Sequence, residues 1–180
     1  PKGVGFLYQK EGVKLAKILH GGSQEEKRRA GTENLAGIVG MASAIDFLTQ
    51  EQQQINWEVY QQFHTYLLER LNQEGIQFEV NGDVEHHLPH ILNLRFSGVP
   101  SNLLLMHLDL QGIAISTGSA CSAGDVEPSH VLEAMYGKDY QSLQESIRIS
   151  FGYRNTQDEV VMLTDTLIAT VKRLKKDSSE

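Results

Sequence analysis

A single cysteine, Cys121, lies in a run of small and hydroxyl-bearing residues, Ser116-Thr117-Gly118-Ser119-Ala120-Cys121-Ser122-Ala123-Gly124. The glycines and hydroxyl groups predict a loop that exposes backbone N–H groups. A thiol on such a loop is accessible, and a reactive thiol needs that accessibility. The alternative is a buried, inert cysteine, as most free cysteines are. Such a cysteine usually lies within an apolar run of the sequence. The composition around Cys121 therefore favours a nucleophile.

A second candidate for chemistry is Arg148, in the run Ser146-Ile147-Arg148-Ile149-Ser150-Phe151-Gly152. The apolar side chains alternate with polar ones, which predicts a strand with its isoleucines on one face and Arg148 on the other. A guanidinium held on a strand suits the capture of a carboxylate through two N–H groups. The alternative is an ordinary solvated arginine at the surface.

A third candidate is Thr32, in the run Lys27-Arg28-Arg29-Ala30-Gly31-Thr32-Glu33-Asn34. Cations, a glycine and a hydroxyl directly ahead of a predicted helix are typical of an anion site, because helix N-terminal N–H groups and arginines attract phosphate or carboxylate. The alternative is a solvated basic turn in which Thr32 is a plain N-cap.

The histidine-rich run over residues 85–90 does not predict a metal site. Adjacent histidines on a strand point to opposite faces, and no second cluster of Cys, Asp or Glu at ligand spacing accompanies them. We expect a loop that leads into a strand over 90–96, and we assign no metal ligand. His64 is expected to be a packed residue at the edge of a core.

The elements that would position these residues alternate between strands and helices. Short strands are predicted over 4–8, which we expect to be buried, and over 76–80, 113–115 and 146–152. Helices are predicted over 34–49, 51–74 and 101–110, after Pro128, and from the capping box of Thr156 and Glu159 onward. The second helix should turn Trp57, Tyr60 and Leu67 toward a core. The fold class is α/β or α+β, with helices covering a sheet.

Composition narrows the function classes. The chain has 180 residues, 40% of them hydrophobic and 22% charged, which is ordinary for a soluble globular protein. A net charge of −7 disfavours a nucleic-acid surface, and no apolar run is long enough for a membrane helix. One cysteine allows no internal disulfide, and no secretory signal is present, so we expect a cytoplasmic protein. A first residue that is not methionine predicts a fragment, a processed product or an incomplete chain.

The cysteine run, followed by Glu127-Pro128-Ser129-His130-Val131-Leu132, resembles the cysteine loop of the cysteine desulfurases. These are pyridoxal-phosphate enzymes that supply sulfur to iron–sulfur cluster assembly. The resemblance, which covers nearly the whole chain, is to the subclass with a long mobile loop. The run Pro-Lys-Gly-Val-Gly-Phe-Leu-Tyr over 1–8 resembles the segment after the lysine that forms the Schiff base with the cofactor. Lys2 does not match that lysine, so we expect it to be absent from this chain.

The resemblance implies that residues 1–50 are the end of the large domain with its linking helix. Residues 51–180 would be the small C-terminal domain of a fold-type I PLP-dependent transferase. In the complete homodimeric enzyme, Arg148 would bind the carboxylate of L-cysteine, and Thr32 the cofactor phosphate of the partner subunit. Cys121 would take the sulfur as a persulfide, leave L-alanine, and pass the sulfur to an iron–sulfur scaffold or another acceptor protein.

We expect this chain alone to be inactive, because the family's cofactor lysine, ring-stacking histidine and pyridine-pairing acid do not match residues present here. Two alternatives stay open. One is a non-catalytic sulfur-carrier or docking module that accepts a persulfide on Cys121. The other is a lyase that acts on selenocysteine or cystine. One local departure from the family pattern is Gly21-Gly22-Ser23, where many members have three glycines.

Overall fold

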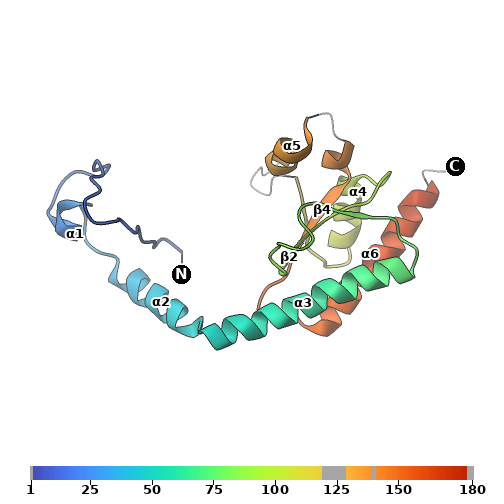
Figure 1. Cartoon of the computed structure of the whole chain (residues 1–180), viewed down its shortest axis with the longest axis horizontal. Helices are drawn as coiled ribbons and strands as arrows, with labels where there is room; N and C mark the ends of the chain where they lie inside the picture. Colours follow the sequence, from blue (N-terminus) through green and yellow to red (C-terminus); the bar gives the residue numbers. More distant parts are fainter. Residues whose placement is uncertain (1, 119–128, 139–140, 178–180) are drawn as a thin grey trace. The chain divides into compact units, whose positions relative to one another are not determined.

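In the computed structural model, residues 2–118, 129–138 and 141–177 are described, and the chain separates into two compact units (Figure 1). The first unit is residues 1–54 and the second is residues 55–180. The division falls within α3 (Gln50–Gln73), a few residues beyond the position expected from the sequence.

The first unit contains α1 (Gln24–Lys27), a single turn, and α2 (Leu35–Phe47). The predicted helix over 34–49 is confirmed, but its N-cap is Asn34 rather than Thr32. The Asn34 side chain accepts a hydrogen bond from the backbone N–H of Gly37 at 3.1 Å, which satisfies one of the free N–H groups of the first turn.

The predicted buried strand over 4–8 is wrong. This segment is irregular, and Phe6, Leu7 and Tyr8 are 77%, 76% and 82% exposed. An apolar run becomes a strand only when a neighbouring strand satisfies its backbone groups, and the described part of this unit holds no strand. The side chains alone therefore gave a misleading signal here.

The second unit is built on an antiparallel sheet in the order β1-β2-β4-β3. The strands are β1 (Glu79–Val80), β2 (Ile91–Arg95), β3 (Ser116–Thr117) and β4 (Ser146–Ser150). Since all pairings among the described strands of this unit are antiparallel, the unit is α+β, in agreement with the mixed class expected. β2 and β4 confirm the predicted strands, including the alternation of buried and exposed side chains.

Two strand predictions need correction. The strand expected over 113–115 lies instead at Ser116–Thr117, inside the run that we had assigned to the cysteine loop, and the strand expected over 76–80 shrinks to Glu79–Val80. In both cases the partner strand sets the boundary, since Ser116 and Thr117 pair with Arg148 and Ile147 of β4. Propensity along one segment does not contain that information.

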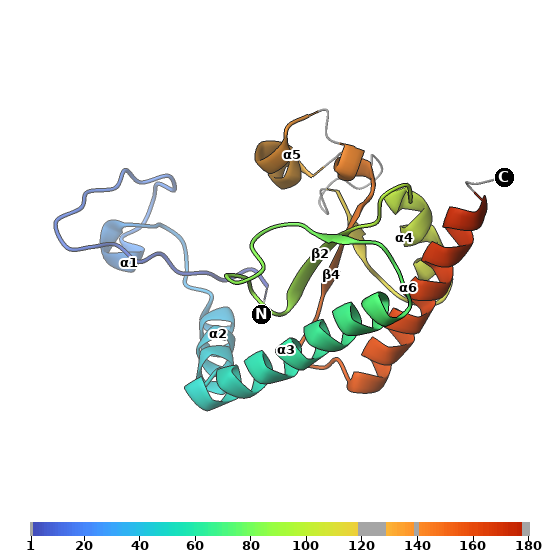
Figure 2. The same ribbon diagram turned by 45° about the vertical axis from the view of Figure 1, so that its right-hand side comes forward.

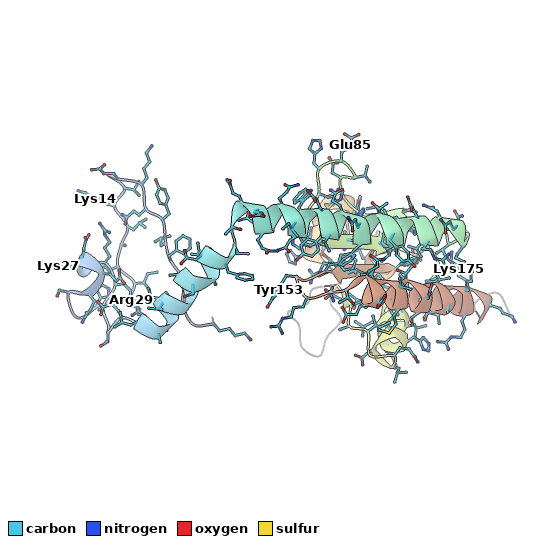
Figure 3. The ribbon with its side chains drawn as sticks, turned by 90° about the horizontal axis from the view of Figure 1, so that it is seen from below. Lys14, Lys27, Arg29, Glu85, Tyr153 and Lys175 are labelled. Atoms are coloured by element: carbon cyan, nitrogen blue, oxygen red, sulfur yellow. The ribbon has the colours of Figure 1, made fainter. Side chains whose placement is uncertain are left out.

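Helices α3 and α6 (Gln157–Asp177) run side by side (Figure 3). They are joined by ion pairs of Arg70 with Asp165 at 3.3 Å and of Lys172 with Glu74 at 2.7 Å. α4 (Ser101–Asp109) packs beside α6. The short helix α5 (His130–Tyr136) lies on the opposite side of β2 and β4 from α3 (Figures 1 and 2), and a 3₁₀ turn, η1 (Gln141–Gln144), precedes β4.

The core of the second unit lies between one face of the sheet and the helices α3, α4 and α6. Its fully buried members include residues from every one of these elements: Leu67, Leu71, Leu92, Leu94, Phe96, Leu104, Leu108, Ile147, Leu167 and Val171. The expected inward face of α3 is partly wrong, because Trp57 is 42% exposed and Phe63, which packs edge-on against Phe151, is buried instead. Within the described ranges, no helix combines the length and apolar character that a bilayer crossing requires.

Candidate active site

Arg148 lies at the centre of the sheet, on the face that the core does not use. β4 is flanked by β2 and β3, and the register places Asn93 opposite Arg148 on one side and Ser116 opposite it on the other. Directly opposite residues of an antiparallel pair share a face, so Asn93, Arg148 and Ser116 form a row across three strands. Their neighbours Ile147 and Ile149 are buried on the other face, which fixes the backbone beneath the guanidinium.

The guanidinium of Arg148 is only partly satisfied. Its Nη2 donates a long hydrogen bond of 3.4 Å to Oγ of Ser116. Its Nε is buried and has no hydrogen-bond partner within the described ranges. No carboxylate among these residues lies within ion-pair distance of Arg148.

A second arginine on the same face, Arg95, behaves differently. Its Nε donates to Glu145 at 2.9 Å and its Nη1 pairs with Glu79 at 3.1 Å. The hydrogen bond that Arg95 donates to Glu145 is the main cause that raises the pKa of Arg95 above its ordinary value. Because its charge is already balanced by two carboxylates, Arg95 is a structural cation, whereas Arg148 keeps its charge available for an anion.

A network of polar side chains lies beside Arg148. Nδ2 of Asn81 donates to Oδ1 of Asn93 at 2.8 Å and to Oγ of Ser146 at 3.0 Å. Ser146 is almost fully buried, so its hydroxyl needs such partners. The sequence showed Asn93 and Ser146 only as polar positions of two strands, because the pairing that brings them together with Asn81 is long-range.

Cys121 lies outside the described residues, as do Ser119 to Pro128, so its predicted exposure stays a prediction. The structure does describe both ends of the segment that carries it. β3 ends at Thr117, next to the strand that holds Arg148, and Gly118 has a φ of 58°, which favours glycine. On the far side Ser129 caps α5, since its hydroxyl accepts from the N–H of Leu132 at 3.4 Å.

Thr32 is exposed in the first unit, and its hydroxyl has no hydrogen-bond partner among the residues that the structure describes. Nearby, the N–H of Gly31 donates to Oε1 of Gln24 at 3.2 Å, and Nη1 of Arg29 donates to the carbonyl of Ala30 at 3.2 Å. The exposed side chain of Arg29, labelled in Figure 3, belongs to the same turn. An exposed hydroxyl and an exposed guanidinium three residues apart in one turn are donor types that fit a phosphate group. Thr32 and Arg148 belong to different units.

Three of the histidines stack on or lie against other rings instead of forming a metal site. The rings of His64 and His87 stack at 4.7 Å, and the rings of Tyr60 and His90 lie 5.7 Å apart. Burial lowers the pKa of His64, and the neighbouring His87 lowers it further. Throughout the described ranges, no group of three or more His, Cys, Asp or Glu side chains is placed to hold a metal ion. His64 occupies the half-buried edge position expected for it.

The family model described as "Aminotransferase class-V" matches residues 1–163. The chain belongs to the class-V aminotransferase family. Enzymes of this family use pyridoxal phosphate as their cofactor. The match extends from the first unit through β4 to the middle of α6, so it includes Thr32, Cys121 and Arg148.

Two similar members of this family are named as cysteine desulfurases. One, from Bacillus subtilis, whose name marks it as a candidate cysteine desulfurase IscS 1, is 52% identical over 97% of this chain and 46% of its own length. The cysteine desulfurase IscS of Dictyoglomus turgidum is 38% identical over 97% of this chain and 44% of its own. The chain thus spans less than half the length of these relatives.

A solved structure titled as a NifS-like protein has the same fold. It superposes with a TM-score of 0.77 at 28% identity, covering 92% of this chain and 41% of the other. The resemblance on which the sequence analysis relied is confirmed at the level of the family and of the fold.

Proposed function

We propose that the protein to which this chain belongs is a pyridoxal-phosphate-dependent cysteine desulfurase, which converts L-cysteine to L-alanine and retains the sulfur. The observation that carries the proposal is the difference between the two arginines on the open face of the sheet. Arg95 is neutralised by Glu145 and Glu79, whereas Arg148 has no carboxylate partner in the described ranges. The names of the relatives supply the reaction class.

In this proposal Arg148 holds the α-carboxylate of the substrate. Its buried Nε and one Nη can donate to the two carboxylate oxygens, which is the geometry in which a guanidinium binds most tightly. Residues 1–50 complete the large domain, and residues 51–180 form the small domain that carries Arg148.

Thr32 would hold the phosphate of the cofactor that belongs to the partner subunit, with Arg29 and Gly31 shaping the turn around it. This role makes the active protein a homodimer. The cofactor, when bound, supplies an electron sink for the substrate carbon.

Cys121 would accept the sulfur. Its thiolate forms a bond to the sulfur of the substrate while the Cβ–S bond of the substrate breaks, and Cβ takes up a proton to give alanine. The sulfur remains on Cys121 as a persulfide, ready for an iron–sulfur scaffold or another acceptor protein. At pH 7 only a few per cent of an ordinary cysteine is thiolate, and a nearby cation or the substrate amine would raise that fraction. A single cysteine that stays a free thiol suits a reducing compartment, and we place the protein in the cytoplasm on that ground.

The test uses the full-length protein loaded with pyridoxal phosphate. Incubation with L-cysteine should release alanine and increase the mass of the peptide containing Cys121 by one sulfur atom. Cys121→Ser should lose both signals, while the adjacent control Ser122→Ala should keep them. Failure of the wild-type protein to form alanine, or alanine formation with Cys121 unmodified, would overturn the proposal. Parallel rates on L-selenocysteine distinguish a selenocysteine lyase from a desulfurase.

A further inference from the structure

We propose that Ser116 is a positioning residue that orients the guanidinium of Arg148 for the substrate carboxylate. The inference rests on the proposed function, because it assumes that Arg148 binds a carboxylate. It assigns to Ser116, which begins the cysteine run, a role in substrate affinity that is separate from the chemistry of Cys121.

The sheet register sets the geometry. Ser116 stands directly opposite Arg148 on β3, so its hydroxyl lies on the same face as the guanidinium, and Oγ accepts from Nη2 at 3.4 Å. An arginine side chain has four rotatable bonds and loses much conformational entropy when it is held in one orientation. A hydroxyl that accepts from one of the two N–H groups of Nη2 fixes the orientation of the planar guanidinium. Nε and Nη2, which share one edge of that plane, can then face the same anion.

The other neighbour in the row bonds elsewhere within the described ranges. Asn93 stands opposite Arg148 on β2, and its Oδ1 accepts from Asn81 at 2.8 Å rather than from the guanidinium. Ser116 is the one side chain in the described ranges with a hydrogen bond to the guanidinium. It is also partly buried, so water competes less for that bond than at an exposed site.

Ser116 also lies close in sequence to the segment that carries Cys121. It starts β3, and three residues later the chain enters the segment from Ser119 to Pro128 that carries Cys121. The strand that orients the carboxylate-binding group therefore also anchors the segment that delivers the thiol. The two ends of one substrate molecule, its carboxylate and its sulfur, would be served from the same strand.

The test compares Ser116→Ala with Ser116→Thr in the full-length, cofactor-loaded protein. Loss of one hydrogen bond that only positions the binding group should raise KM for L-cysteine about threefold to tenfold with kcat nearly unchanged. The dissociation constant for L-alanine, measured by equilibrium titration, should rise by the same factor. Ser116→Thr keeps the hydroxyl and should restore both values. Ser150→Ala is the matched control, because Ser150 lies on the same strand face as Arg148 but is exposed and opposite Ile91.

A double substitution separates positioning from a merely structural role. In an Arg148→Gln background, Ser116→Ala should raise the dissociation constant for L-alanine no further, since the group to be positioned is gone. An equal additional rise in that background would overturn the inference, as would unchanged KM and alanine binding in the single Ser116→Ala variant. Wild-type protein that forms no alanine from cysteine instead refutes the proposed function. In that event the alanine titrations still decide whether Ser116 acts through Arg148.

Discussion

Two arginines on one sheet face show that the role of a charged residue depends on its partners. Arg95 and Arg148 lie on neighbouring strands and point the same way, yet only Arg95 is balanced by carboxylates within the described ranges. A guanidinium cannot lose its proton near neutral pH, so Arg148 stays positively charged even without a carboxylate partner. Burial of the Nε of Arg148 without a hydrogen-bond partner in the described ranges is unfavourable, and an anion that binds there would remove that cost.

Replacement of Arg148 should therefore affect substrate affinity strongly. Arg148→Gln removes the charge and one end of the fork, and we expect KM for L-cysteine in the full-length protein to rise by about tenfold to a hundredfold. Arg154→Gln is the matched control, since Arg154 is exposed and its guanidinium lies 5.5 Å from the ring of Tyr153. Equal KM values for the two variants would show that Arg148 does not bind the substrate.

At the scale of an element, α6 begins as its sequence predicts. The backbone N–H of Thr156 donates to Oε2 of Glu159 at 2.9 Å, and the N–H of Glu159 donates to Oγ1 of Thr156 at 3.3 Å. This reciprocal pair is a capping box, which satisfies two backbone N–H groups at the helix start. The hydrogen bond from Thr156 is also the main cause that lowers the pKa of Glu159. Because α6 forms a wall of the core, its first turn determines where that wall starts.

The capping box makes a prediction about local opening and pH. Thr156→Ala should destabilise the first turn of α6 by about 1 kcal/mol, which is about fivefold faster hydrogen exchange at residues 157–160. Since the pKa of Glu159 is lowered in the folded state, its carboxylate stabilises the turn above its ordinary value of 4.5. That stabilisation is lost as the pH falls through the lower, folded value. Wild-type exchange should thus approach that of Thr156→Ala in acid.

Thr166→Ala is the control for this experiment. Thr166 lies in the middle of the same helix, where its hydroxyl bonds back to the carbonyl of Met162 at 2.7 Å and caps nothing. Its exchange at residues 157–160 should match wild type. The capping interpretation fails if both threonine variants accelerate exchange equally.

At the scale of the whole molecule, the two units differ in how they bury apolar side chains. The second unit has a contiguous core drawn from β2, β4 and three helices. In the first unit, most large apolar side chains are exposed, among them Phe6, Leu7, Ile18 and Phe47. Exposure on this scale is typical of a surface that another part of a protein covers. It is consistent with a chain that spans less than half the length of its relatives.

The core of the second unit predicts a large contrast between two leucines. Leu94 on β2 is fully buried, whereas Leu110 after α4 is 76% exposed. Leu94→Ala should lower the free energy of opening of the sheet by about 2–5 kcal/mol, because it leaves a cavity between layers, while Leu110→Ala should change it little. Native-state hydrogen exchange of the β2 and β4 amides in the full-length protein reports this unit separately. Similar effects of the two substitutions would contradict the described core.

The sequence predicted best the elements that depend on residues close together in the chain. α2, α6, β2 and β4 carry strong local periodicity or capping signals, and each was predicted close to its observed position. β3 and the run over 4–8 were misjudged, because strand pairing is decided by a distant partner. The candidate site shows the same pattern. Arg148 was visible from its alternation, but the roles of Ser116 and Asn93 depend on a register that joins residues far apart in the chain.

β4 carries core side chains and site side chains in strict alternation within five residues. That arrangement imposes a parity rule on the protein. An insertion or deletion of a single residue inside the strand reverses the faces of the residues beyond it, which turns an isoleucine toward solvent or Arg148 into the hydrophobic layer. Changes in chain length near this strand must therefore be absorbed before Ser146 or after Ser150. The chain can therefore vary in length only outside this strand, because Arg148 must stay on the face opposite the core.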